Sequence, residues 1–151
     1  MYITISTGIG AGFMIDGRLS VELDHAEVGL MKLYHNGELQ IWEDFASGRA
    51  FYEKTGKFSN EVDDPVVWQQ FAKDVAAGLI VILPFFQPEV ILIGGSVGAD
   101  FEKYGGLLRR EVAETAHPDF RRVKIERAEN PEYAVSIGAQ IYGQQKLAGR
   151  K

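Results

Sequence analysis

The sequence has no cysteine, few histidines and no excess of positive charge. Without cysteine, neither a disulfide bond nor a thiolate metal site can form among the 151 residues. The three histidines are dispersed along the chain, so we expect no structural zinc site. The formal net charge of −5 argues against direct nucleic-acid binding, because such binding requires a basic surface.

Long hydrophobic runs and an N-terminal signal peptide are also lacking. A membrane span requires about 20 apolar residues. The most apolar stretch, Val75 to Phe86, is shorter and is followed by Gln87-Pro88-Glu89, so we expect a buried helix there. A signal peptide has a basic region, then an apolar segment and then a cleavage site, and the first residues do not show this succession. We therefore expect a cytoplasmic protein with no membrane partner, folded as a single domain over residues 1–151.

The N-terminal segment has the pattern of a small antiparallel meander. Alternation of aromatic or β-branched residues with small polar ones predicts a strand over Tyr2–Ser6. The glycine-rich segment Thr7–Gly12 is expected to be a turn. Strands are then expected over Phe13–Ile15 and Leu19–Leu23, because the Asp16-Gly17 pair between them favours a two-residue hairpin turn.

A second hairpin and a series of helices follow. The hairpin is expected over Leu30–Trp42 around Asn36-Gly37. Asp63 or Asp64, just before Pro65, has the pattern of a helix N-cap. Helices are expected over Glu43–Lys54, Pro65–Phe85, Asp100–Ala116 with an interruption at Gly105-Gly106, and Tyr133–Leu147.

Two further strands complete the expected fold. Val90–Ile93 is a continuous apolar run, typical of a strand buried on both faces of a sheet, and Val123–Ile125 is a short strand. The order of elements predicts one α/β domain, with a mixed five-stranded sheet and helices on both faces.

Three groups of residues are candidate binding sites. In Thr7–Gly12, three alternate glycines would let backbone N–H groups approach an anion, and Thr7 adds a hydroxyl; a tight hairpin is the alternative. Gly94-Gly95-Ser96 follows a buried strand at the sheet end where α/β proteins bind ligands; an ordinary loop is the alternative. Glu27 and Glu43 could accept hydrogen bonds from sugar hydroxyls; solvent-exposed charge is the alternative.

Taken together, these segments resemble the C-terminal half of the ROK family, which combines bacterial sugar kinases with related repressors. The resemblance covers nearly the whole chain. It lies, in order, in Ile3–Gly12 with Asp16-Gly17, Ala26-Glu27-Val28-Gly29-Leu30, Glu43-Asp44-Phe45-Ala46-Ser47-Gly48, Pro88–Ser96 and Ser136-Ile137-Gly138-Ala139. The implied fold is the second ribonuclease H-like domain of the actin/hexokinase superfamily.

The resemblance implies a function and a set of ligands. The function is that of a glucokinase-like hexose kinase, which transfers the γ-phosphate of ATP, with Mg²⁺, to a hydroxyl of a hexose or amino-sugar. The implied nucleotide-binding residues are Thr7, Gly8, Gly10 and Gly12 near the phosphates and Gly94, Gly95 and Ser96 near the adenosine. Glu27 and Glu43 would contact the sugar.

Departures from the family pattern limit these expectations. Leu30 stands where the sugar motif has histidine, and the cysteine cluster is absent, so the family's zinc is not expected. The first phosphate loop and the catalytic aspartate belong to the family's N-terminal half, so no catalytic residue is assigned here. The chain alone is expected to be inactive, with a separate N-terminal half as a possible partner.

A non-catalytic alternative remains open, namely a sugar-sensing or dimerisation domain like that of the ROK-type transcriptional regulators. We also expect a homo-oligomer, because exposed apolar helix faces that would normally pack against another domain favour self-association.

Overall fold

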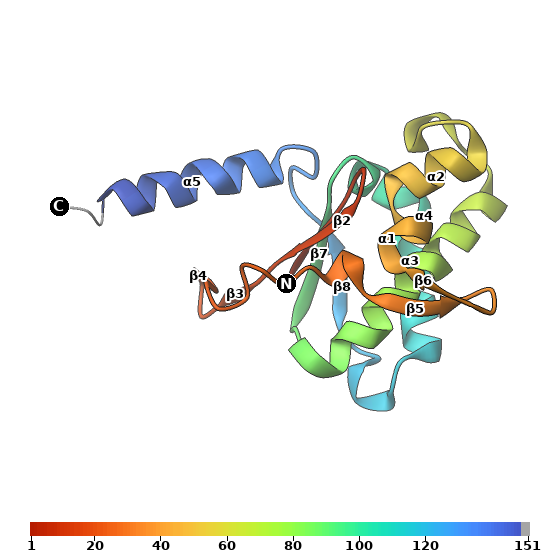
Figure 1. Ribbon diagram of the computed structural model, residues 1–151, viewed down its shortest axis with the longest axis horizontal. Coiled ribbons are helices and arrows are strands. Elements are labelled where there is room, and N and C mark those ends of the chain that lie inside the picture. Colours follow the sequence, from red (N-terminus) through yellow and green to blue (C-terminus); the bar gives the residue numbers. More distant parts are fainter. Residues whose placement is uncertain (149–151) are drawn as a thin grey trace.

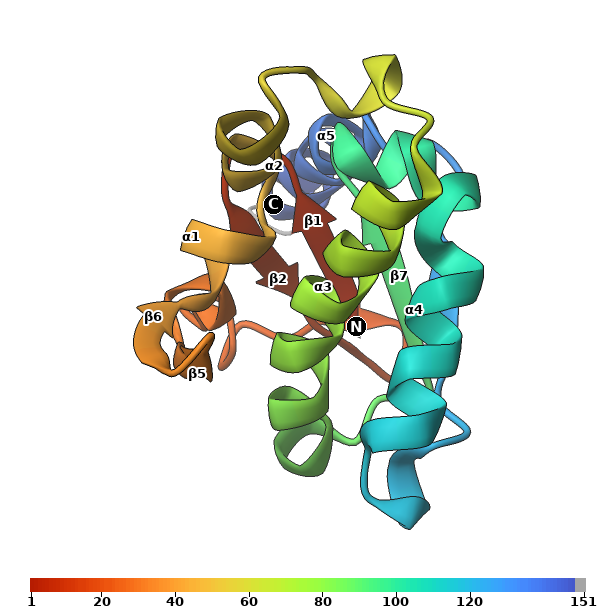
Figure 2. The same ribbon diagram turned by 90° about the vertical axis from the view of Figure 1, so that its right-hand side faces the viewer.

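The centre of the protein is a four-stranded mixed sheet with the strand order β2-β1-β7-β8 (Figures 1 and 2). The computed structural model describes residues 1–148. Strand β1 (Tyr2–Ile5) pairs antiparallel with β2 (Ile9–Gly12) and parallel with β7 (Val90–Gly94). Strand β8 (Lys124–Arg127) pairs parallel with β7. The α/β class is confirmed, but the main sheet has four strands and not five.

Much of the glycine-rich segment is strand β2 and not a turn. Gly10 lies opposite Thr4 in the ladder and Ile9 lies opposite Ile5. The turn is confined to residues 6–8, where the Ser6 N–H donates to the Gly8 carbonyl at 3.0 Å. The segment forms a strand because its residues alternate between the two faces of the sheet. Ile9 is buried in the core, and Gly10 and Gly12 face the other side.

Two small hairpins form separate two-stranded sheets. Strand β3 (Met14–Ile15) pairs with β4 (Arg18–Leu19), and β5 (Lys32–His35) pairs with β6 (Glu38–Ile41). Their turn residues all have positive φ, from 51° at Asp16 to 85° at Gly37, which confirms both predicted turns.

The strand expected over residues 19–23 is reduced to Arg18–Leu19, and with β3 it lies outside the main sheet. Two of the five expected strands are therefore absent from the main sheet, and β2, where a turn was expected, is its fourth strand. After Leu19 the Ser20 N–H donates to the Phe13 carbonyl at 2.9 Å, and the Ser20 hydroxyl donates to the Glu22 carboxylate at 3.0 Å. The chain turns at these residues and does not continue as a strand.

Two helices replace the single one expected over residues 43–54. Helix α1 (Trp42–Ala46) ends at Ser47, which has an extended backbone, and α2 (Gly48–Thr55) begins directly after it. The Ser47 hydroxyl accepts from the Ala50 N–H at 3.2 Å and so caps α2. The Gly48 N–H donates to the Ser6 carbonyl at 2.6 Å, which joins the start of α2 to the end of β1.

Helices α3 (Pro65–Phe86) and α4 (Phe101–Thr115) cover one face of the sheet (Figure 2). Helix α3 starts as predicted, with the Asp64 carboxylate accepting from the Val66 N–H at 2.8 Å. By length and composition α3 could cross a membrane, but more than half of its apolar window is buried. Its apolar composition is that of a core helix, because its buried apolar side chains belong to the same core cluster as Ile3 and Ile91.

Helix α4 continues through Gly105 and Gly106, so the predicted interruption is wrong. A Cβ atom at Gly105 would overlap the ring of Phe101, which is buried in the core. The glycine therefore permits close packing within the helix and does not break it.

The second face of the sheet has no helix packed along it in the described part of the chain. Helix α5 (Ala134–Ala148) follows β8 and extends away from the body of the protein (Figure 1). Strand β7 was expected to be buried on both faces, but Leu92 is 38% exposed. The reason is that Ile91 and Ile93 point to the core, whereas Leu92 points to the uncovered side of the sheet. Short 3-10 helices complete the fold at η1 (Val28–Leu30), η2 (Ser59–Glu61), η3 (Val97–Asp100) and η4 (Pro118–Phe120).

Candidate functional site

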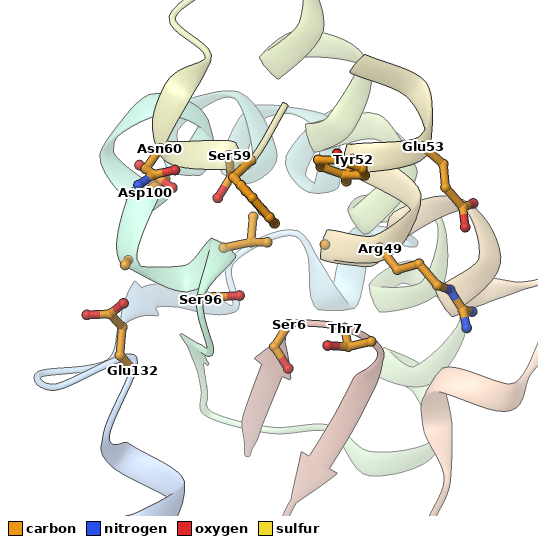
Figure 3. Close-up of a pocket in the computed structure, with 14 residues that line it drawn as sticks. Ser6, Thr7, Arg49, Tyr52, Glu53, Ser59, Asn60, Ser96, Asp100 and Glu132 are labelled. Carbon is orange, nitrogen blue, oxygen red and sulfur yellow. The ribbon is translucent and has the colours of Figure 1, made fainter. Parts of the chain in front are cut away.

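A cavity of about 720 Å³ opens beside the carboxyl ends of β1 and β7 (Figure 3). Ser6 and Thr7, which follow β1, form one side, and Ser96, which follows β7, forms another. Helix α2, the loop after it, η3 and Glu132 form the rest of the lining. This position is where open α/β sheets bind ligands, and the volume suits a small molecule or cofactor. The structure therefore brings Thr7 and Ser96, from two separate predicted motifs, to one cavity.

Glu43 lies directly against the turn that contains Thr7. Its Oε2 atom accepts a hydrogen bond from the Ile9 N–H at 3.0 Å. A Cβ atom at Gly8 would lie 2.5 Å from the same oxygen, so any larger residue at this position would displace the carboxylate from its present place. The predicted sugar-binding acid and the predicted phosphate turn are thus neighbours, although 34 residues separate Glu43 from Ile9.

Arg49 on α2 lines the cavity and also lies near this acid. Its guanidinium forms an ion pair with the Asp44 carboxylate at 2.9 Å and lies 4.0 Å from Glu43 Oε1. Among the residues that line the cavity, all of them within the described part of the chain, Arg49 is the only cation. An anion bound beside Thr7 would therefore form its ion pair with Arg49.

Gly94 and Gly95 are buried and allow β7 to approach β1 closely. A Cβ atom at Gly94 would overlap the Tyr2 hydroxyl, and one at Gly95 would overlap the Ile5 backbone. Gly95 also has a φ of 87°, which favours glycine. Of the three residues of this motif, Ser96 is the one that lines the cavity.

Lys103 holds the loop after α2 against α4. Its ammonium donates to the Val62 carbonyl at 2.9 Å and pairs with Asp63 at 3.0 Å and Asp100 at 3.5 Å. Burial by itself lowers the pKa of Lys103, but the two carboxylates outweigh this and raise its pKa. Burial also raises the pKa of the neighbouring Tyr104 phenol, with a further contribution from Asp100. The far wall of the cavity is therefore fixed by ionic contacts.

The remaining predicted residues lie outside the cavity lining. Gly10 and Gly12 are further along β2, on the face of the sheet away from the core. Glu27 precedes η1 and is exposed, as is Leu30 at the end of η1. Their ligand roles stay predictions.

Sequence reasoning missed the wall formed by α2 and the following loop. Arg49, Tyr52, Phe58 and Asn60 all line the cavity. In the sequence they belong to a segment with no glycine-rich or acidic motif. The available signal was Gly56, which has a φ of 69° and ends α2, so that the chain turns back toward the strand ends. Within residues 1–148, no group of three or more His, Asp or Glu side chains is arranged to hold a metal ion.

Comparisons with known proteins agree on one family. The ROK family model matches residues 1–146. The fructokinase of Zymomonas mobilis subsp. mobilis is 29% identical over 145 residues, which cover 84% of this chain and 46% of that protein. The fructokinase of Pediococcus pentosaceus is 31% identical over 112 residues, which cover 64% of this chain and 38% of that protein. The chain thus spans less than half the length of these relatives.

A solved structure shows the same fold. The crystal structure of a ROK family protein from Streptococcus pneumoniae TIGR4, in complex with sucrose, superposes with a TM-score of 0.75 at 23% identity. The match covers 98% of this chain and 58% of that one.

Proposed function

This chain belongs to the ROK family, and from that premise we propose that it is the nucleotide- and sugar-binding half of an ATP-dependent sugar kinase with the actin/hexokinase type of fold. The observation that supports this most is the contact between the two predicted sites. Thr7 lines the cavity, and Glu43 contacts the turn beside Thr7. A phosphate on the turn and a sugar hydroxyl at Glu43 would lie side by side, as phosphoryl transfer requires.

The donors around the turn suit the phosphate end of a nucleotide. Thr7 and Arg49 both line the cavity, and Gly8 follows Thr7 in the turn. The other charged lining residues are the acids Glu53, Asp100 and Glu132, so the cavity as a whole is negative. A triphosphate would therefore bind together with a divalent cation, and Mg²⁺ with ATP is the expected pair. The Ser96 hydroxyl would face the nucleoside.

The sugar would lie on the outer side of Glu43. A carboxylate accepts hydrogen bonds from vicinal hydroxyls, and Glu27 is the second predicted acceptor. The two relatives compared above are named fructokinases, so fructose is the first sugar to test. A hexose or amino-sugar remains the substrate class.

Phosphoryl transfer also requires a base for the sugar hydroxyl, and no residue of this chain is proposed for that role. We expect that a separate N-terminal half supplies it. The isolated chain should accordingly bind ligands without turnover.

One observation favours a second function, which is sugar sensing without phosphoryl transfer. Leu30 stands where the family's sugar motif has histidine, and its exposed side chain cannot bond a hydroxyl. A domain of this kind would bind sugar but not nucleotide.

Calorimetric titration separates the two functions. We expect the chain to bind the Mg²⁺ complex of a non-hydrolysable ATP analogue, and Thr7→Ala to weaken this binding by about 10-fold, because a hydrogen bond to a charged group is lost. Thr115→Val, which removes an exposed hydroxyl on α4, is the matched control and should bind normally. Sugar binding with no nucleotide binding would favour the sensor. Rapid sugar phosphorylation by the isolated chain would contradict the absence of a base.

A further inference from the structure

Two large aromatic side chains on the cavity wall are exposed. Tyr52 on α2 is 45% exposed and Phe58 in the following loop is 66% exposed, and both line the cavity. Their ring centroids are 4.9 Å apart with an interplanar angle of 37°. By contrast, the neighbouring Phe51 and Trp68 are buried and pack against each other in the core. The pair therefore presents two exposed aromatic rings, tilted against each other, in the lining of the cavity and outside the buried core.

The pair is held in place by the backbone around it. Helix α2 ends at Gly56 in the left-handed region, and the Thr55 hydroxyl accepts from the Lys57 N–H at 3.1 Å. The Phe58 N–H donates to the Glu61 carboxylate at 2.8 Å. Lys103 then fixes the end of this loop to α4. The backbone that carries the two rings is thus held before any ligand binds, and the rings contact each other, which lowers the entropy cost of binding.

Polar groups are distributed unevenly around the rings. Figure 3 shows Arg49 on one side of the cavity and Asn60, Asp100 and Glu132 on the other, with Tyr52 across the cavity from Ser6 and Thr7. Arg49 and the acid Glu53 are on one side of the cavity, whereas Asn60, Asp100 and Glu132 supply hydrogen-bond acceptors on the other side. This arrangement suits a ligand with an anionic end, a flat aromatic part and outward N–H or O–H donors, which is the chemistry of a purine nucleotide.

We propose that Tyr52 and Phe58 form the stacking surface for the purine base of the bound nucleotide, and that this pair determines the preference for base-containing ligands. The proposal rests on the proposed nucleotide-binding function and extends it to residues that no recognised motif includes. Stacking of a base on an aromatic side chain is lost on truncation to alanine, with an expected loss of affinity of about 10-fold per ring.

The test compares ligands with and without a base. The Mg²⁺ complexes of ADP, UDP and inorganic pyrophosphate are titrated into the chain. We expect ADP to bind more tightly than UDP, because its larger ring covers more of the aromatic surface, and UDP more tightly than pyrophosphate. Tyr52→Ala and Phe58→Ala should each weaken ADP binding by about 10-fold and leave pyrophosphate binding unchanged. Tyr52→Phe should retain ADP binding.

Tyr34→Ala is the matched control, because Tyr34 is an exposed aromatic residue on the β5–β6 hairpin outside the cavity lining. Circular dichroism checks that each variant is folded. Equal binding of ADP and pyrophosphate, or normal ADP binding by both alanine variants, would overturn the stacking proposal. If Thr7→Ala still weakens binding of both ligands in that case, the proposed function stands without it. If neither ligand binds to the unchanged chain, the nucleotide-binding function fails and the stacking proposal with it.

Discussion

Replacement of Asp74 by alanine is expected to be among the most destabilising single substitutions in the protein. Asp74 lies in the middle of the apolar helix α3 and is only 3% exposed. Its Oδ1 atom is 3.1 Å from His35 Nε2 and 2.8 Å from Gln70 Nε2, and its Oδ2 atom is 2.7 Å from Lys54 Nζ. One buried carboxylate thus joins β5, α2 and α3.

The same cluster holds α1 in position. The Trp42 indole N–H donates to the Asp74 carbonyl at 3.1 Å, and Lys54 Nζ donates to the Phe45 carbonyl at 2.8 Å. The His35 ring stacks on Phe45 with centroids 4.0 Å apart. Since α1 contains Glu43, a substitution at Asp74 should affect the candidate site as well as stability.

The magnitude follows from burial. Removal of one partner from a buried ion pair costs about 3–5 kcal/mol. Lys54 is 46% exposed, so water screens its share of the interaction, and we expect the lower value of about 3 kcal/mol for Asp74→Ala. Lys54→Met keeps the apolar stem of the side chain but leaves the buried Asp74 carboxylate without its ammonium partner, so it should cost about as much, about 3 kcal/mol.

Urea unfolding followed by circular dichroism measures both values, and the midpoint for Asp74→Ala should fall by roughly 1–2 M. Asp119→Ala is the control, because Asp119 is exposed and pairs only with the exposed His117; it should change the free energy of unfolding by less than about 0.5 kcal/mol. A loss below about 1 kcal/mol for either Asp74→Ala or Lys54→Met would refute the account of a buried cluster.

Three further substitutions test separate contacts. Gly8→Ala would place a methyl group against the Glu43 carboxylate, so sugar affinity measured by calorimetry should fall by about 10-fold; normal affinity would contradict the contact. Gly78→Ala would overlap the Trp42 indole, and we expect a loss of about 2 kcal/mol in urea unfolding, since the indole must move. Ile141→Asp places a charge among the exposed apolar residues of α5, so self-association measured by sedimentation should weaken, and an unchanged mass distribution would show that α5 is not the interface.

The local features of the fold were predictable from the sequence. Both hairpin turns follow from Asp16-Gly17 and Asn36-Gly37, because few residues other than these adopt positive φ easily. The start of α3 follows from Asp64-Pro65, a pair that satisfies the first turn of a helix. Each of these signals depends only on neighbouring residues.

Features that depend on distant contacts were not predictable. The segment Ile9–Gly12 reads as a turn by composition, and only its pairing with β1 shows that the glycines form one side of a strand. In the candidate site, Thr7, Glu43 and Ser96 could be named from motifs, but the contact between Glu43 and the turn depends on the path of the chain through α1. The aromatic wall at Tyr52 and Phe58 had no motif and required the position of α2.

The central claim is that the cavity beside Thr7 binds a nucleotide. The most direct test is a two-dimensional NMR titration of the ¹⁵N-labelled chain with the Mg²⁺ complex of a non-hydrolysable ATP analogue. We predict that the largest amide shifts occur at Thr7, Gly8, Arg49 and Ser96, which surround the cavity or its turn. Shifts confined to other surfaces, or no shifts at millimolar nucleotide, would contradict the claim.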